Sequence, residues 1–197
     1  MTDRRAGGDR GAGRTARLVA AGLFTIGGVL AGARVARAQE GPDLAGTWEG
    51  TLEDHPARPG APRVDVTIEL GALPTADSTC VPWRTTYREQ GTVRMVKDYR
   101  LCRGRGAGDL VVDEGGSLRL RADLIGGLLL STFKAGTVLL TTRLAVRGDT
   151  LVEEIITAED APATDGVVSL RTRGVQRLTV VRRSRVPAGA PARWTPR

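Results

Sequence analysis

The sequence predicts an all-β domain, an antiparallel meander of about eight to ten strands that closes into a barrel with little or no helix. Apolar and polar residues alternate along several segments, which is typical of a sheet with one packed face and one wet face. The clearest are residues 64–70, 118–124, 138–146 and 177–180. Short turn sequences, EGGS, KAGT and RGDT, separate successive segments. Links this short join antiparallel strands, because a parallel pair needs a much longer crossover.

Helical patterning is weak throughout this region. Residues 118–133 form the only segment long enough for a helix, and two adjacent glycines, Gly126 and Gly127, interrupt it. A meander of this size avoids exposed sheet edges by closing on itself, so we expect a barrel. A two-sheet sandwich is the alternative.

Residues 1–38 carry the features of a secretory signal peptide in their usual order. An arginine-rich segment, residues 4–17, precedes an uncharged run, residues 18–33, and a small-residue site, ARA at 36–38. This order predicts cleavage before Gln39 and export to the bacterial periplasm or the extracellular space. An uncleaved N-terminal anchor is the alternative, although the run is shorter than the roughly 20 apolar residues that span a bilayer.

The charge of the chain changes once this leader is removed. The whole chain has 29 Lys+Arg and 22 Asp+Glu, and residues 1–38 hold seven Arg and two Asp, which leaves 22 basic and 20 acidic residues. Aromatic residues make up only 4% of the chain. A nucleic-acid surface combines excess positive charge with interleaved aromatics, so we expect no nucleic-acid partner. We also expect no stable membrane span after cleavage.

Residues 39–185 are expected to form one domain, and residues 186–197 a Pro- and Arg-rich disordered tail with little apolar surface to bury. Trp194 is the exception in the tail. It is expected to be exposed, with docking on the barrel or on a partner as the alternative.

The two cysteines predict a strand register. An exported chain with two cysteines is expected to oxidise them, and a hairpin that turns at Gly91 places Cys80 opposite Cys102. The same register places Val81 opposite Leu101, Trp83 opposite Tyr99, Arg84 opposite Asp98, Tyr87 opposite Met95, and Arg88 opposite Arg94. A disulfide closing a loop of this size stabilises the fold by roughly 3 kcal/mol. Two unrelated buried thiols are the alternative.

One face of this hairpin is rich in aromatic side chains. It carries Trp83, Tyr87, Met95 and Tyr99, with Lys97 among them. We interpret these five residues as the lining of a ligand site. A lysine on an inward face is costly unless it reaches water or a partner. Lys97 is therefore either a polar anchor inside a cavity or a residue at the open rim.

A second inward charge is expected from the segment around Glu153 and Glu154. Neighbours on a strand point to opposite faces, so one of the two glutamates must face the interior. The segment is apolar on both faces, so the sequence does not decide which. An inward glutamate facing Lys97 would be the most reactive pair of charges in the barrel.

The first predicted strand contains Gly46-Thr47-Trp48, which resembles the G-x-W signature that begins the first strand of lipocalins and other calycin barrels. In those families the tryptophan plugs one end of the barrel, and an arginine from the last strand packs over it. The resemblance implies that Trp48 closes the barrel and that Arg177 or Arg182 covers it.

The chain departs from these families at two places. Residues 54–62 leave no room for the two helices that fatty-acid-binding proteins insert, and the Pro-rich tail replaces the helix that follows the last lipocalin strand. The only histidine, His55, lies in that first loop, so a haem ligand is not implied.

No catalytic set, metal site or cofactor motif is found. One histidine and two paired cysteines cannot form a His/Cys metal centre, and no G-x-S-x-G elbow is present. The glycine-rich residues 104–108 match neither phosphate-binding fingerprint. We therefore expect a protein that is not an enzyme.

Three functions follow from this reading. The leading hypothesis is an exported, non-catalytic, lipocalin-like barrel that binds a small hydrophobic ligand. The alternative is an interaction module of the cell envelope with a filled barrel, and a weaker alternative is a barrel isomerase or cyclase with an inward acid–base residue. A cavity of several hundred Å³ beside Trp83, Tyr87 and Tyr99 would favour the first.

Overall fold

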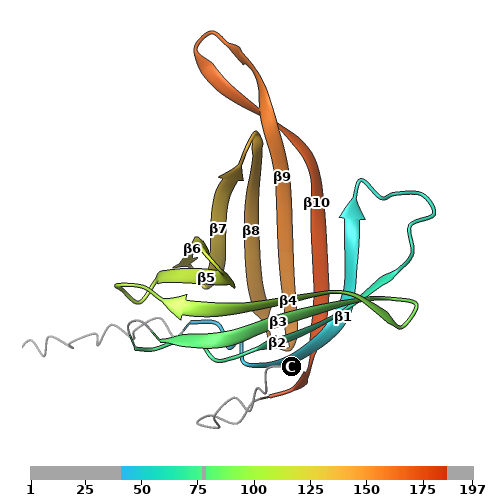
Figure 1. The fold of residues 1–197 in the computed structure, drawn as a ribbon, viewed down its shortest axis with the longest axis vertical. Helices are drawn as coiled ribbons and strands as arrows, with labels where there is room; N and C mark the ends of the chain where they lie inside the picture. Colours follow the sequence, from blue (N-terminus) through green and yellow to red (C-terminus); the bar gives the residue numbers. More distant parts are fainter. Residues whose placement is uncertain (1–40, 77–78, 186–197) are drawn as a thin grey trace, which may run out of the picture. The chain divides into compact units, whose positions relative to one another are not determined.

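The computed structural model describes residues 41–76 and 79–185, so the expected signal peptide, the C-terminal tail and Trp194 lie outside the described residues. Ten antiparallel strands form a single closed barrel (Figure 1). The strands are β1 (Gly46–His55), β2 (Val64–Leu70), β3 (Cys80–Glu89), β4 (Thr92–Arg103), β5 (Asp109–Gly115), β6 (Leu118–Ile125), β7 (Leu128–Ala135), β8 (Val138–Arg147), β9 (Thr150–Thr164) and β10 (Val167–Ser184). The described residues contain no helix, which confirms the predicted all-β meander.

Every strand pairs with its neighbours in sequence, and β1 closes the barrel on β10. The closing register runs from Thr47 opposite Ser184 to His55 opposite Val175. This closure excludes the two-sheet sandwich. A search of the described residues for a long apolar helix that could cross a membrane found none.

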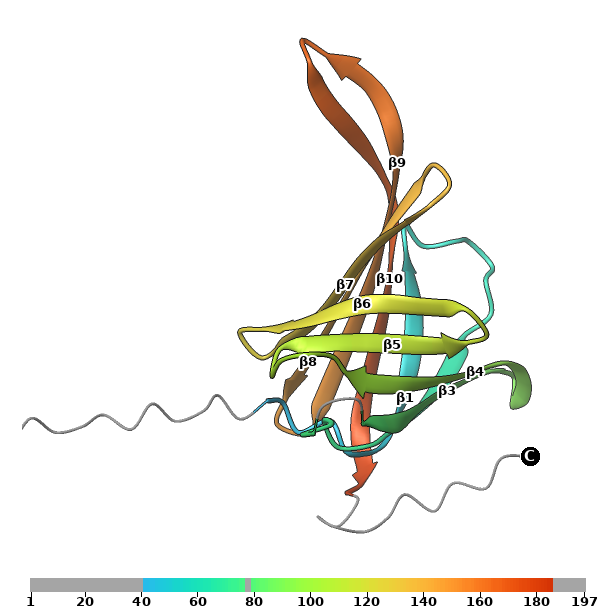
Figure 2. The same ribbon diagram turned by 60° about the vertical axis from the view of Figure 1, so that its left-hand side comes forward.

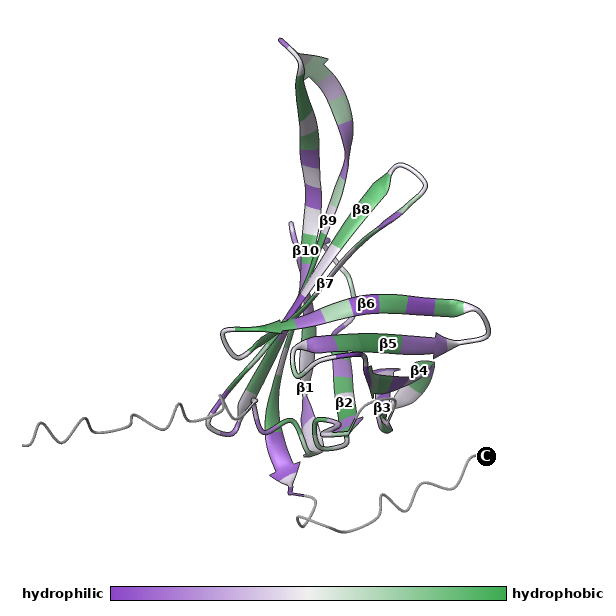
Figure 3. Cartoon of the chain, turned by 90° about the vertical axis from the view of Figure 1, so that its left-hand side faces the viewer, coloured by the Kyte–Doolittle hydropathy of each residue, from purple (hydrophilic) through white to green (hydrophobic). Residues whose placement is uncertain are grey.

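The alternation read from the sequence sorts side chains between the interior and the outside. In β2 the side chains of Val66, Ile68 and Leu70 are 2%, 0% and 3% exposed, whereas Glu69 between them is exposed. Figure 3 shows the same alternation as hydrophobic and hydrophilic bands along β5 and β6. The packed interior of these alternate residues is the core of the domain.

The strands fall into two groups that cross. Strands β7–β10 run together, and β2–β6 lie across them (Figures 1 and 2). Two neighbouring strand pairs in the wall share only a few residue pairs. Strands β6 and β7 pair only from Asp123–Leu130 to Ile125–Leu128. Strand β4 pairs with β5 only from Arg100 to Arg103, although β4 begins at Thr92.

The β3–β4 hairpin confirms most of the predicted register. Cys80 and Cys102 face each other and form a disulfide, and Trp83 lies opposite Tyr99. The predicted pairing of Arg88 with Arg94 is wrong, because a bulge after Tyr87 shifts the register and places Arg88 opposite Val93. The cause is a two-residue turn.

The turn residues are Gln90 and Gly91, which both have positive φ. Turns of this geometry match the twist of the paired strands. Here the turn leaves one extra residue in β4, which forms the bulge. Arg94 forms an ion pair with Glu89 instead, at 3.1 Å.

The two glycines around Trp48 allow the first and last strands to approach closely. A Cβ atom on Gly50 would overlap the carbonyl oxygen of Thr179, and one on Gly46 would overlap that of Ser184. Gly46 also has a φ of 140°, which side-chain-bearing residues rarely adopt. Glycine is therefore required where β1 meets β10.

Candidate functional site: an interior cavity beside the disulfide hairpin

Trp48 lies in β1, where the first strand pairs with the last. Its side chain is fully buried, and its indole nitrogen donates a 3.0 Å hydrogen bond to the carbonyl oxygen of Leu44. The guanidinium of Arg182 stacks on the indole, 3.9 Å from the ring centroid. Arg177 lies on the outer surface, 2.9 Å from Glu154. Of the two candidates, Arg182 therefore covers the tryptophan.

Inward-facing side chains border an interior cavity of about 110 Å³. Strands β3 to β9 all contribute to its wall. Four aromatic side chains, Trp83, Tyr87, Tyr99 and Phe133, share this wall with three ionisable ones, Lys97, Glu114 and Glu153. The wall thus combines aromatic and aliphatic side chains with polar and charged ones.

Four of the five predicted lining residues reach this cavity, namely Trp83, Tyr87, Lys97 and Tyr99. Met95 does not line it, and its side chain is 51% exposed. Met95 shares the inward parity of Lys97 and Tyr99 but lies further than either from Arg100, the last residue of β4 that pairs with β5. No strand therefore covers it on that side.

Sequence reasoning missed Phe133 and Glu114, which come from β7 and β5. Phe133 shares its parity with Leu129 and Ser131, which are both buried. This alternation indicates that Phe133 points inward. It does not indicate that Phe133 lies near the β3–β4 hairpin, because closure of the barrel sets the position of β7 relative to that hairpin.

The structure decides which of the two neighbouring glutamates points inward. Glu153 is 8% exposed and lies between Leu144 of β8 and Leu178 of β10, which are both buried. Burial raises the pKa of Glu153, and the nearby positive charge of Lys97 opposes that rise. The inward glutamate and Lys97 thus line the same cavity, with the charge of Lys97 near enough to affect the Glu153 carboxyl.

Glu154 points the other way. It accepts hydrogen bonds from Arg177 and from Arg143, at 2.9 and 3.0 Å. The bond from Arg177 is the largest of the causes that lower the pKa of Glu154. Two adjacent glutamates therefore have pKa values displaced in opposite directions.

The charge of Lys97 lies against the aromatic wall. The residue is half-buried, and its ammonium is 5.5 Å from the centroid of the Tyr87 ring. A cation at this distance from the face of a ring is attracted by its quadrupole. The Tyr87 ring is thus an interior contact of the Lys97 ammonium.

Both tyrosines of the cavity remain neutral across the physiological range. Burial raises the pKa of Tyr99 to about 12, with contributions from the charge of Glu114 and from a hydrogen bond to it. Burial also raises the pKa of Tyr87, and the charge of Glu153 adds to the shift. The two hydroxyl groups therefore retain their protons.

Trp83 differs from Trp48 in its polar atom. Its side chain is 7% exposed, and its indole nitrogen has no hydrogen-bond partner among the described residues. Buried polar atoms are almost always paired, so an unpaired donor at a cavity wall marks a place for a ligand or water.

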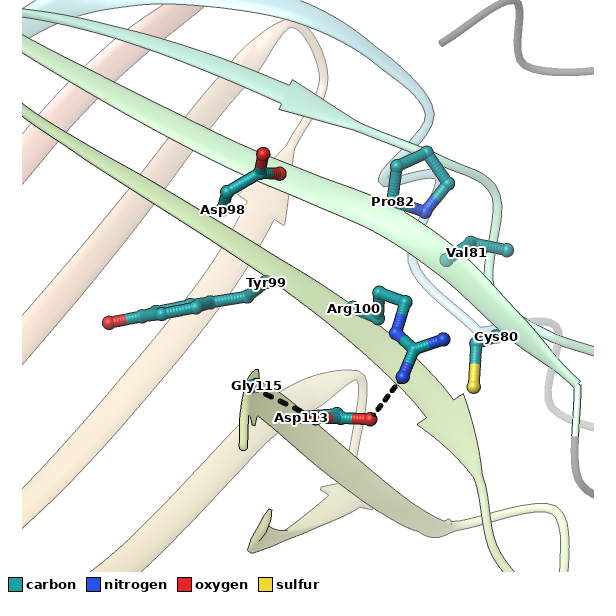
Figure 4. Close-up of a pocket in the computed structure, with 8 residues that line it drawn as sticks. All are labelled: Cys80, Val81, Pro82, Asp98, Tyr99, Arg100, Asp113 and Gly115. Carbon is teal, nitrogen blue, oxygen red and sulfur yellow. Dashed lines mark hydrogen bonds and ion pairs between the residues drawn. The ribbon is translucent and has the colours of Figure 1, made fainter. Parts of the chain in front are cut away.

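A larger cleft of about 600 Å³ lies on the outside, where β4 and β5 separate. In Figure 4 the Tyr99 ring points away from Arg100 and Asp113, which are joined at 2.6 Å. The backbone amide of Gly115 also donates to Asp113 and, with Arg100, lowers the pKa of its carboxyl. These groups satisfy one another, so we place the candidate site in the interior cavity.

The described residues contain no group of three or more His, Cys, Asp or Glu side chains that could hold a metal ion. Comparisons with protein-family models, with curated proteins and with solved structures found no match. The fold and the cavity define this part of the chain as a ten-stranded antiparallel meander barrel with a small aromatic interior site.

Proposed function

We propose that this chain is a lipocalin-like barrel that binds a small molecule in its interior cavity without catalysis. Four aromatic rings around an interior space carry the proposal, because such a wall offers a large apolar surface to a ligand. The G-x-W segment in β1 and the stacking of Arg182 on Trp48 support the relationship to calycin barrels.

The volume of the cavity limits the ligand. Its 110 Å³ is smaller than the several hundred Å³ named in the sequence analysis as favouring a ligand-binding barrel. Drug-sized ligands occupy roughly 300–1,000 Å³, whereas a cavity of about 150 Å³ holds a benzene molecule. The ligand is therefore a compound of a few carbon atoms, or the end of a longer one.

The filled-barrel alternative is less favoured by the polar groups of the interior. Core packing excludes voids and pairs its polar atoms. Here a buried indole nitrogen of Trp83 and a buried carboxyl of Glu153 border an open space. Buried polar groups beside an open space are typical of a ligand-binding site.

A barrel isomerase is the second candidate function, and Glu153 is the observation that favours it. A buried carboxyl with a raised pKa keeps its proton at higher pH than an ordinary glutamate, as a general acid requires. An isomerase would lose its turnover in Glu153→Gln, whereas a binding protein would keep its ligand.

Export is part of the proposal. A disulfide suits an oxidising compartment, and the Cys80–Cys102 bond is consistent with one. We expect the intact mass of protein recovered from a periplasmic fraction to begin at Gln39. Retention of residues 1–38 would indicate the uncleaved anchor instead.

Native mass spectrometry of the exported protein tests the binding function. A co-purifying small molecule is expected in the wild type. It should be lost in Thr142→Phe, which fills the cavity, and kept in Thr132→Phe, where the exposed side chain lies on the other face of the sheet. Equal occupancy in both variants would contradict binding in the interior.

A further inference from the structure

The interior cavity is lined by a residue whose buried hydrogen-bond donor has no acceptor among the described residues. The indole nitrogen of Trp83 is buried without a partner among the described residues, and an indole is only able to donate. Lys97 brings an ammonium with three donors and no acceptor. Both residues line the same cavity, so a ligand that carries a hydrogen-bond acceptor would complement them.

The other hydroxyl groups of the wall are partly committed. Tyr99 is hydrogen-bonded to Glu114, and Ser131 donates a 2.6 Å bond to the carbonyl oxygen of Arg121. These interactions hold the wall together where β4, β5, β6 and β7 meet. The hydroxyl groups of Thr85, Tyr87 and Thr142 also line the cavity. Trp83 and Lys97 differ from all of these residues in that they donate hydrogen bonds and accept none.

The strand register brings these two donors together. Trp83 lies opposite Tyr99, and Lys97 is two residues before Tyr99 on β4, so Trp83 and Lys97 are diagonal neighbours on one face. Diagonal neighbours in an antiparallel pair lie about 7–8 Å apart, within reach of long side chains. One oxygen-bearing group can therefore contact both.

The charges of the cavity exclude other ligand classes. A cationic ligand would meet the ammonium of Lys97, and a pure hydrocarbon would leave the indole of Trp83 unpaired. Burial favours the neutral form of Glu153, so this carboxyl does not repel an anion as an ionised one would. The aromatic ring of Phe133 offers contact to an apolar tail.

We propose that the cavity recognises a short-chain carbonyl or carboxylate compound, whose oxygen accepts hydrogen bonds from Trp83 and Lys97. This inference rests on the proposed function, because it names the ligand class of the same cavity. The shared chemistry is an oxygen acceptor on a small apolar body. A carboxylate differs from a ketone in its negative charge and its second acceptor oxygen.

Titration of the mature protein with butyrate, butanone, butylamine and cyclopentane, followed by NMR of the ¹⁵N-labelled chain, tests the proposal. Butyrate or butanone is expected to bind more tightly than cyclopentane and to move the indole N–H resonance of Trp83. A tighter complex with butyrate would identify a carboxylate ligand, and one with butanone a neutral carbonyl ligand. Loss of one indole signal in Trp83→Phe assigns the resonance.

Substitution of the donors sharpens the test. Trp83→Phe keeps an aromatic ring but removes the donor, and Lys97→Met keeps the length but removes the charge. Each is expected to weaken binding of the preferred oxygen compound about tenfold, the loss of one buried hydrogen bond, while cyclopentane binding is unchanged. The matched control is Lys134→Met, because Lys134 lies outside and pairs with Asp160 at 2.7 Å.

The possible outcomes separate the inference from the proposed function. Cyclopentane binding as tightly as both oxygen compounds, or an indole resonance that stays still, would overturn the inference and leave a ligand-binding barrel in place. Preferential binding of butylamine would also overturn it. If none of the four compounds moves any resonance of the cavity, the proposed function itself fails.

Discussion

The guanidinium of Arg182 lies 3.9 Å from the ring centroid of Trp48, and the two residues are cross-strand partners in the pairing that closes the barrel. Arg182 also donates a 2.8 Å hydrogen bond to the carbonyl oxygen of Asp43 and a further one to that of Ala45. The same side chain thus joins the last strand to the first and covers the ring of Trp48.

Loss of Arg182 should destabilise the protein more than loss of any exposed arginine. Arg182→Met removes a nearly buried guanidinium, its stacking on Trp48 and its bonds to backbone carbonyls. We expect the free energy of unfolding to fall by about 2 kcal/mol or more. Arg177→Met, on the outer face of the same strand, should cost less than about 1 kcal/mol. Urea denaturation measures both, and equal losses would contradict a special role for Arg182.

Gly50→Ala should strain the contact between β1 and β10. The added methyl group overlaps the carbonyl oxygen of Thr179, so backbone must move, at a cost of about 1–3 kcal/mol. Gly106→Ala is the control, because no atom lies within 4 Å of the place that its methyl group would take, and the change should be nearly neutral. Thermal unfolding of the two variants compares them, and an unchanged midpoint for Gly50→Ala would refute the close approach.

Glu153→Gln should make the protein more stable at neutral pH. The folded-state pKa of Glu153 is raised above its ordinary value of 4.5, so the unfolded chain releases this proton first as the pH rises. Ionisation therefore favours unfolding above pH 4.5, and each unit of elevation removes about 1.4 kcal/mol. The advantage of Glu153→Gln should grow from pH 4.5 upwards and vanish at lower pH. A difference independent of pH would argue against a buried acid.

The neighbouring substitution Glu154→Gln provides a control of opposite sign. The pKa of Glu154 is lowered in the folded state, chiefly by Arg177, so its ionised form stabilises the protein above pH 4.5. That stability is lost as the pH falls through the lowered pKa. Glu154→Gln should thus be destabilising at pH 7 and nearly neutral in acid. Matching pH profiles for the two variants would show that the glutamates are not on opposite faces.

The chain contains two tyrosines, so their ionisation can be followed by phenolate absorbance. In the folded protein we expect no titration near the ordinary value of 10, because burial raises the pKa of Tyr99 to about 12 and also raises that of Tyr87. Stability from these neutral hydroxyls is present below pH 10 and is lost as the pH rises. In urea both should titrate near 10. A phenolate signal near pH 10 from folded protein, checked by circular dichroism, would contradict their burial.

Local patterns in the chain account for much of this architecture. Alternation in β2 predicted which residues are buried, and the spacing of Cys80 and Cys102 around Gly91 predicted their pairing. The same hairpin register also brought Trp83, Lys97 and Tyr99 to one face. These predictions hold because strand periodicity and short turns are local properties, which a few residues determine.

The sequence by itself determined the class of fold, the disulfide hairpin and one aromatic face of the cavity. Only the tertiary structure decided that Glu153 points inward, that Arg182 covers Trp48 and that Met95 lies outside the cavity wall. Strand β9 is apolar on both sides, so its orientation depends on pairing with β8 and β10. These outcomes follow from closure of the barrel, because closure sets the register between strands far apart in the chain.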